Sequence, residues 1–239
     1  MIKLLILLFT GAKLGKLLLS VGSMLLTIWV YAQIYGMSFA VGFVVLLLTH
    51  ELGHYGAARQ RGLDVSLPAF IPFIGAWINL REHPHNAETE AYVAYAGPFV
   101  GTLAAFACFY QAQIGNDDFW MALAYSGFML NLFNMLPISP LDGGRITQVL
   151  SPRIWLLGAP MLVALFFYRP SPMLVLIGIM CIPSLMAAWR YNPNTPEALG
   201  YRDLPDKKRY EYMLMYFGLT AFLAIMTYES HLLLRHGSL

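Results

Sequence analysis

Apolar residues are gathered into long runs that are separated by short polar segments. A helix needs about 20 mostly apolar residues to cross the hydrocarbon core of a bilayer, and most runs reach that length, although the fifth is short. The breaks carry turn-forming residues, such as Gly-Asn-Asp-Asp at 115–118 and Arg-Pro-Ser-Pro at 169–172. The runs occupy residues 17–35, 38–58, 91–113, 119–138, 154–168, 171–190 and 211–234. This pattern predicts an all-α polytopic membrane protein.

The composition supports the same class. Hydrophobic residues make up 58% of the 239 residues and charged residues only 12%, whereas a typical soluble domain has about 25% charged residues. The formal net charge is +2 and the basic residues are scattered among the loops, so the expected partner is the lipid bilayer and not nucleic acid. The two cysteines, Cys108 and Cys181, lie within apolar runs and give no disulfide framework.

The positions of lysine and arginine predict how the runs are oriented. Short loops rich in these residues stay in the cytoplasm, and such loops precede the first run, follow the second and precede the last. The break at 115–118 has two aspartates and no Lys or Arg, which suits the outside. The sequence thus predicts a multi-pass protein of the cell membrane of a prokaryote, with its N-terminus in the cytoplasm.

A His-Glu-Leu-Gly-His sequence occupies residues 50–54, near the end of the second apolar run. On a helix, His50 and His54 share one face, so both imidazoles can reach one metal ion. Glu51 can reach a water on that metal, and the pattern is typical of zinc hydrolases. If the helix begins near residue 38, His50 lies about 18 Å along it. That depth is within the hydrocarbon layer, nearer to the cytoplasmic side, where we expect the site to open.

A third ligand is expected, because catalytic zinc has three protein ligands and one open position for water. The strongest candidate is Asp142, in the sequence Asn-Met-Leu-Pro-Ile-Ser-Pro-Leu-Asp-Gly-Gly-Arg at 134–145. Pro137 and Pro140 should end the fourth span, and the glycines after Asp142 permit a sharp turn. An aspartate at membrane depth needs a cationic partner, which would be one zinc ion per chain. Alternatively, Asp142 caps the next helix or pairs with Arg145.

These two motifs, in this order, resemble the site-2 protease family of intramembrane zinc metalloproteases, peptidase family M50. Residues 70–80 also resemble the family's membrane-associated β-hairpin, and residues 90–101 resemble the opening of its third core helix. The resemblance implies a six-helix bundle that cleaves transmembrane proteins within their transmembrane segments, as in regulated intramembrane proteolysis. It leaves the run at 211–234 as an extra C-terminal helix.

On this basis we divide the chain into four parts. The first 16 residues make a poor signal peptide, since Lys13 and Lys16 follow a short apolar stretch at once, and we expect them to lie at the membrane surface. The parts are an N-terminal interfacial segment (1–16), a six-span protease domain (17–190), a cytoplasmic loop (191–210) and an additional C-terminal helix with its tail (211–239).

The resemblance also implies a role for each motif residue. Glu51 would be the general base, and Asn134 would hold the substrate backbone or the developing oxyanion. An uncharged donor such as Asn134 can stabilise an oxyanion without adding charge to a buried site. The alternative for Asn134 is a helix–helix hydrogen bond, together with Asn131 one turn earlier. Zinc would be bound by three residues: His50, His54 and Asp142.

The segment at 66–80 is apolar, contains two prolines and is too broken for a spanning helix. Its second half has small and β-favouring residues, and an exposed strand edge there could pair with an unwound substrate by strand addition. Alternatively, the segment is a plain re-entrant loop that plugs the site. The strand hypothesis predicts four substrate-binding residues: Gly75, Ala76, Trp77 and Ile78.

Two other functions remain open. A membrane protease of the prenyl-protein-processing type would need a glutamate as third ligand, but Glu197, Glu211 and Glu229 lie in a loop or far along the chain. A non-catalytic metal- or helix-binding membrane protein, such as an inactive protease homologue or a transporter, would not need Glu51 beside a ligand histidine. Zinc-dependent cleavage that is lost on Glu51→Gln would separate the enzyme from the binding protein.

Overall fold

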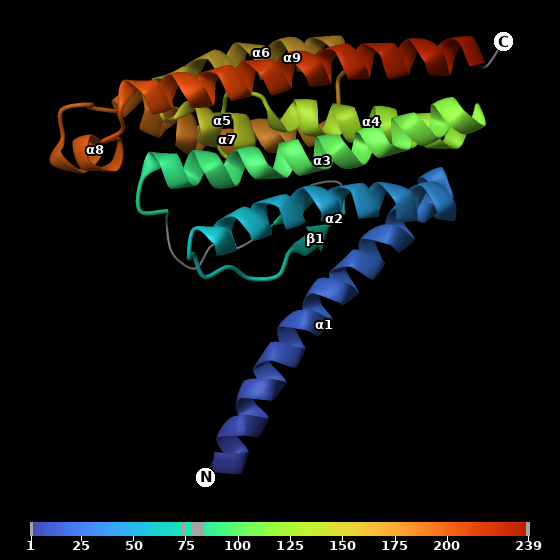
Figure 1. Ribbon diagram of the computed structural model, residues 1–239, viewed down its shortest axis with the longest axis horizontal. Coiled ribbons are helices and arrows are strands. Elements are labelled where there is room, and N and C mark those ends of the chain that lie inside the picture. Colours follow the sequence, from blue (N-terminus) through green and yellow to red (C-terminus); the bar gives the residue numbers. More distant parts are fainter. Residues whose placement is uncertain (1, 73–74, 78–83, 238–239) are drawn as a thin grey trace.

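The computed structural model describes residues 2–72, 75–77 and 84–237, and most of them are helical (Figure 1). Long helices coincide with the apolar runs, because a helix satisfies its own backbone hydrogen bonds in a medium without water. In chain order the elements are α1 (Ile2–Tyr35), α2 (Met37–Gln60), β1 (Ala69–Ile71), β2 (Gly75–Trp77), α3 (Ala87–Gly115), α4 (Asp118–Asn134), α5 (Asp142–Thr147), the 3-10 helix η1 (Pro152–Ile154), α6 (Trp155–Tyr168), α7 (Pro172–Arg190), α8 (Pro196–Tyr201) and α9 (Asp206–Gly237).

Within the described residues, five helices are long and apolar enough to cross a membrane. They are the Leu17–Tyr35 part of α1, α2, α3, α7 and the Asp206–Arg235 part of α9. The predicted helical, multi-pass membrane protein is confirmed at this level. Two of the predicted runs form shorter helices: α4 has 17 residues and α6 has 14. Helix α4 ends before Pro137 because proline removes a backbone donor and obstructs the preceding turn.

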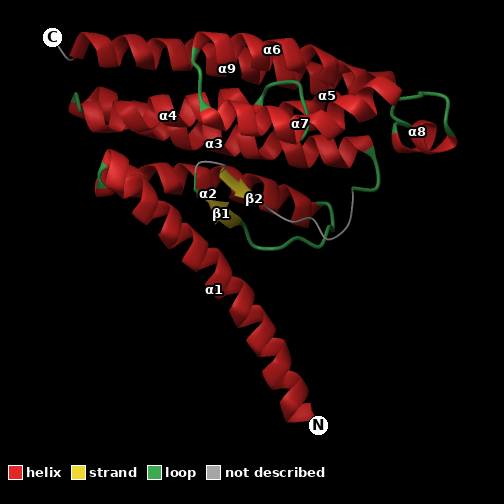
Figure 2. Cartoon of the chain, turned by 180° about the vertical axis from the view of Figure 1, so that it is seen from behind, coloured by secondary structure: helices red, strands yellow, loops and turns green. Residues whose placement is uncertain are grey.

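The long helices stack in layers, with α3 and α4 between α2 on one side and α9 on the other (Figures 1 and 2). The main core lies where these four helices meet, and it contains Leu46, Ala105, Phe128 and Leu223, one from each helix. A Cβ at Gly127 of α4 would lie 2.8 Å from the Cβ of Ala105. Small residues therefore let α3 and α4 approach closely, as is common between helices in membranes.

Helix α9, which we predicted as an addition to the six-span domain, packs along α4. The Tyr216 hydroxyl donates a hydrogen bond to the carbonyl oxygen of Met135 at 2.7 Å. Leu219 and Leu223 are buried in the same core as Phe128. The last helix thus shares a core with the centre of the bundle, and the division of the chain at residue 210 stays a prediction.

Helix α1 runs unbroken from Ile2 to Tyr35, and its first half projects away from the bundle (Figure 2). Its second half packs on α2, where Tyr31 is buried with Ala40 and Val44. The predicted interfacial segment and the first span therefore belong to one helix. Their division near residue 16, where the membrane surface would lie, stays a prediction.

Strands β1 and β2 pair antiparallel, with Phe70 opposite Ala76. The other edge of β1 is bonded to α1, because the Phe70 N–H donates to Oγ of Ser23 at 3.0 Å and Oγ of Ser20 donates to the Pro68 carbonyl oxygen at 2.5 Å. With β1 bonded on both sides, a further strand would have to pair with β2.

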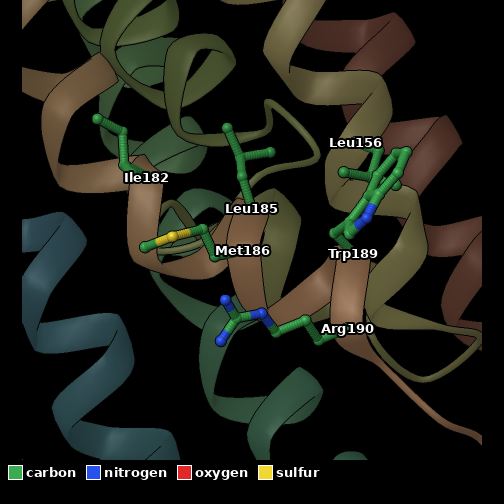
Figure 3. A pocket seen from close by; sticks show the side chains of 6 residues that line it. All are labelled: Leu156, Ile182, Leu185, Met186, Trp189 and Arg190. Atoms are coloured by element: carbon green, nitrogen blue, oxygen red, sulfur yellow. The ribbon is translucent and has the colours of Figure 1, made fainter.

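A hollow of about 350 Å³ lies between α6 and α7 (Figure 3). Its lining is apolar except at one end, where Arg190 extends beneath Met186. Trp189 beside Arg190 at the end of a helix is the pairing expected at a membrane interface. None of the residues predicted for chemistry lines this hollow, which is formed by Leu156, Ile182, Leu185, Met186, Trp189 and Arg190.

Candidate metal centre

Helix α2 carries both histidines on the face that it presents to α3 and α4. His50 and His54 lie one turn apart, and only 3% and 7% of their surfaces are exposed. Glu51, the next residue after His50, is also buried. The predicted helix contains the whole motif, since α2 runs from Met37 to Gln60. Local helix geometry therefore brings two metal-binding side chains together without help from the rest of the fold.

Asp142 reaches the same place through a tight turn between α4 and α5. It is the first residue of α5, and two glycines follow it. A Cβ on Gly143 would lie 2.2 Å from the Met135 carbonyl oxygen, and one on Gly144 would lie 2.2 Å from the Ser139 nitrogen. Only glycine fits against the backbone at both positions. The glycines therefore allow the turn to fold back and carry the carboxylate toward α2.

Three ligand atoms converge at this point. Oδ2 of Asp142 lies 3.2 Å from Nε2 of His50 and 3.2 Å from Nε2 of His54, and the two Nε2 atoms are 3.1 Å apart. Ligand atoms held about 2.0–2.2 Å from a tetrahedral zinc ion are roughly 3.3–3.6 Å from each other. The observed spacing is close to that range, and the donor set of two imidazoles and one carboxylate is one that zinc prefers. In the described part of the chain, no other group of three such side chains comes this close.

Hydrogen bonds fix which nitrogen of each histidine faces the centre. Nδ1 of His50 donates to Oδ1 of Asn131 at 2.8 Å, and Nδ2 of that asparagine donates to the Gly127 carbonyl oxygen at 2.7 Å. Nδ1 of His54 donates to the Val93 carbonyl oxygen at 2.8 Å. In a neutral imidazole the other nitrogen then has a lone pair and no proton. Two lone pairs and a carboxylate oxygen then face one another, and together they could hold a metal ion.

Glycines of α3 make room for these side chains. A Cβ on Gly97 would lie 2.2 Å from Nε2 of His54, and one on Gly101 would lie 2.4 Å from Oδ1 of Asn131. On α2, a Cβ on Gly53 would lie 2.5 Å from the carbonyl oxygen of Ala96. Gly97 and Gly101 lie one turn apart on α3, a spacing that is common where helices pack closely. In the structure, the space that these glycines leave is filled by His54 and by Asn131, the asparagine that bonds His50.

The two asparagines of α4 have different partners. Asn131 is buried and bonds His50, whereas Asn134 is half-buried and donates through Nδ2 to the Leu130 carbonyl oxygen at 3.0 Å. The helix–helix hydrogen bond that was the alternative for this pair is therefore made by Asn131. The role of Asn134 stays a prediction. The signal for Asn131 in the sequence was a polar residue within an apolar run, since such residues seek a partner on another helix.

The second oxygen of Asp142 faces a cation of the chain. Nη1 of Arg145 lies 3.7 Å from Oδ1 of Asp142. The pair with Arg145, which the sequence left as an alternative to metal binding, thus coexists with the convergence on the histidines, because each uses a different carboxylate oxygen.

The four residues predicted to bind substrate are only partly described. Gly75, Ala76 and Trp77 form β2, and Ile78 lies outside the described residues. Strand β2 lies next to α2, the helix that carries the histidines. The structure therefore places a β-strand beside the motif helix, and its contact with substrate stays a prediction.

The sequence pattern of peptidase family M50 matches residues 38–114 and 110–156. The chain belongs to peptidase family M50. The M50 match runs from α2 through the sheet, α3, α4 and α5 to η1, so it contains every side chain that converges at the metal centre. Helices α7, α8 and α9 lie beyond the matched residues.

Individual relatives of this M50 chain align with about half of it. A zinc metalloprotease of Methanocaldococcus jannaschii is 29% identical over 119 residues, which are 46% of this chain and 34% of that protein. Rip3 of Mycobacterium tuberculosis is 32% identical over 131 residues, 49% of this chain and 32% of that protein. Stage IV sporulation protein FB of Bacillus subtilis is 27% identical over 110 residues, 45% of this chain and 38% of that protein. The aligned part spans about a third of the length of these relatives.

Proposed function

We propose that this M50 protein is an intramembrane zinc endopeptidase that hydrolyses peptide bonds in the transmembrane segments of other proteins. The observation that carries the proposal is the convergence of His50, His54 and Asp142 beside Glu51, on and between helices that are apolar enough to lie in a membrane. These three ligands would bind one zinc ion per chain. The site has the donor set and the hydrogen-bonded histidines that such an ion requires.

The buried carboxylate of Glu51 is the proton carrier in this proposal. When bound, zinc lowers the pKa of a water molecule to about 7 and polarises the scissile carbonyl. Glu51 accepts the proton of that water at its carboxylate and passes it to the nitrogen of the departing amine. Its buried position beside His50 keeps the proton away from bulk water between the two transfers.

Asn134 is the second residue for which we propose a direct role. In this proposal its Nδ2 donates to a substrate carbonyl oxygen or oxyanion through the N–H that is not bonded to the Leu130 carbonyl oxygen. A donor without charge stabilises the oxyanion without the desolvation penalty of a buried cation. Asn131 is the less suitable candidate, because it is buried and both ends of its amide are bonded within the protein.

Strand β2 is where we propose that the substrate binds. Peptide bonds inside a helix are shielded by their own hydrogen bonds, so a transmembrane substrate must unwind before it can be attacked. An unwound segment can satisfy its backbone by pairing with a strand edge. The contacts of β1 with Ser20 and Ser23 support this site on β2, because they leave β2 as the strand to which another can add.

We propose that the protein lies in the cell membrane of a prokaryote, with its N-terminus and the opening of the site on the cytoplasmic side. The support is the distribution of Lys and Arg, including the cluster between α8 and the first turns of α9. In this orientation the N-terminal interfacial segment (1–16), the loop at 191–210 and the exit of α2 face the cytoplasm. The protease domain would be 17–190, and 211–239 would be the additional helix and tail.

The experiment compares Glu51→Gln with Glu229→Gln, an exposed glutamate on α9. The purified full chain is reconstituted in lipid vesicles with a reporter protein that has a single transmembrane segment. We expect the wild type and Glu229→Gln to cleave the reporter, and Glu51→Gln to lose activity by about 10²–10⁴-fold, the usual contribution of a general base. Zinc content, measured on the same preparations, should be equal in all three.

Two results would contradict the proposal. If the wild-type protein contained less than one-tenth of a zinc ion per chain, the proposed metal centre would be contradicted. A full complement of zinc without cleavage of any transmembrane reporter would favour the alternative, a non-catalytic metal- or helix-binding membrane protein.

A further inference from the structure

The connection between α7 and α9 folds back onto the end of the bundle where α5 lies, and it contains the short helix α8 (Figure 1). Leu204 is buried against Val149, just beyond α5. The side chain of Arg202 donates to the Gln148 carbonyl oxygen at 3.0 Å and to the Tyr191 hydroxyl at 2.9 Å. These contacts attach the connection to the residues that follow Asp142, so it is a docked element of the fold.

A line of polar contacts leads from this connection to the metal centre. The hydroxyl of Tyr201, the last residue of α8, donates a hydrogen bond to Oε2 of Glu90 on α3. Oε1 of Glu90 accepts from Nε of Arg145 at 3.4 Å, and Nη1 of Arg145 lies 3.7 Å from Oδ1 of Asp142. Four side chains from three helices therefore form one series, and its last member is a predicted zinc ligand.

In this series of contacts, each side chain restrains the position of the next one. Arg145 has a long side chain with several donors, and free in this position it could move across both oxygens of Asp142. Glu90 holds the Nε edge, so that Nη1 faces Oδ1 and leaves Oδ2 to the histidines. Without a further partner, Glu90 could turn away from Arg145, since 20% of its side chain is exposed. The hydroxyl of Tyr201 holds it in place.

Tyr201 acts as a permanent donor in this arrangement. Burial raises the pKa of the Tyr201 hydroxyl above its ordinary value, and the negative charge of Glu90 raises it further. An ordinary tyrosine already has a pKa of about 10, so this hydroxyl stays protonated at physiological pH. The hydroxyl of Tyr201 therefore remains able to donate to Glu90 in that range.

We propose that Tyr201, Glu90 and Arg145 are positioning residues that orient the carboxylate of Asp142 for metal binding, and that α8 thereby couples the connection between α7 and α9 to the metal centre. The inference rests on the metal-binding part of the proposed function. It assigns a role to one residue beyond the M50 match, Tyr201, which lies outside residues 38–156. Removing the Tyr201 hydroxyl should weaken metal binding although no ligand is touched.

The test measures the zinc affinity of the full chain in detergent by competition with a chromophoric chelator. Outer-shell changes cost about 10–100-fold in metal affinity, and we expect Arg145→Gln to fall in that range. Tyr201→Phe, which acts through two intervening side chains, should lower the affinity by about 5–10-fold. The matched control is Tyr210→Phe, which removes the same hydroxyl from a tyrosine that is 75% exposed, and its affinity should equal that of the wild type.

A second pair of measurements separates positioning from a general loss of structure. In a Glu90→Ala background, which removes the acceptor of the Tyr201 hydroxyl, Tyr201→Phe should cause no further loss of affinity, because the two changes act on one series and are not additive. The visible absorption spectrum of the cobalt-substituted protein should change in Tyr201→Phe and remain unchanged in Tyr210→Phe, since it reports the coordination of the ion.

Two results would overturn the inference. One is an unchanged zinc affinity together with an unchanged cobalt spectrum in Tyr201→Phe, and the other is full additivity of the affinity losses caused by the Glu90 and Tyr201 substitutions. Either result, with a wild type that binds one zinc ion, would leave the proposed function intact. A wild type that binds no zinc would instead overturn the proposed function itself.

Discussion

The packing of α3 against His54 makes Gly97 the most sensitive test of the metal centre. A Cβ at this position would lie 2.2 Å from Nε2 of His54 and 2.3 Å from Cε1 of the same ring. Ordinary contacts between such atoms are about 3.5 Å, so Gly97→Ala must displace the ring or α3 by more than about 1 Å. Metal–ligand distances tolerate only about 0.2 Å. One methyl group should therefore remove a ligand from the site.

Neither adjustment preserves the ligand. If the ring turns away, Nε2 leaves the centre. If α3 retreats, the Val93 carbonyl oxygen retreats with it, because Val93 is one turn before Gly97, and the 2.8 Å hydrogen bond to Nδ1 of His54 is lost. Overpacking of this kind costs about 1–3 kcal/mol of stability, which a bundle of this size can withstand. We expect Gly97→Ala to remain folded and to lose zinc affinity by at least about 100-fold, since it affects a ligand directly.

The assay is zinc content by mass spectrometry together with chelator competition, on protein whose helix content is checked by circular dichroism. The control is Gly178→Ala in α7, where a Cβ would meet nothing within 4 Å, and it should bind zinc as the wild type does. A Gly97→Ala protein with zinc affinity within about threefold of wild type, roughly 0.6 kcal/mol, would refute the reasoning. It would mean that Nε2 of His54 is not a ligand atom.

The remaining predictions concern the two asparagines and the sheet. Asn131→Leu should lower zinc affinity by about 10–100-fold, because Nδ1 of His50 loses its acceptor; unchanged affinity in a chelator titration would contradict the orientation that we infer for the ring. Asn134→Leu should leave zinc binding unchanged and lower kcat for a transmembrane reporter by about 10²-fold. A loss of zinc in this variant would instead indicate that Asn134 has a structural role. Ser23→Ala should raise KM for the reporter severalfold at constant zinc content, because the N–H of Phe70 loses its 3.0 Å partner and the sheet is held less firmly; an unchanged KM would speak against binding at β2.

Features that depend on short stretches of chain could be predicted from the sequence. The apolar runs become helices because their length and composition leave no better way to satisfy the backbone in lipid. The two histidines of α2 share a face because a helix turn has a fixed geometry, whatever surrounds it. The turn before Asp142 could be predicted from its prolines and glycines, since each constrains the backbone locally. These elements contain the candidate ligands.

What joins those elements was decided by the tertiary structure. Asn131 and Asn134 are both asparagines near the end of α4, and only the packing of α4 on α2 shows that Asn131 is the one that bonds His50. The sequence predicted an additional C-terminal helix, and only the structure shows that α9 packs into the core with α4. Tyr201 lies 111 residues from Glu90, and no local pattern connects them. Such contacts depend on how whole helices pack, because the side chain that fills a given space is chosen by its neighbours in three dimensions and not by its neighbours in the chain.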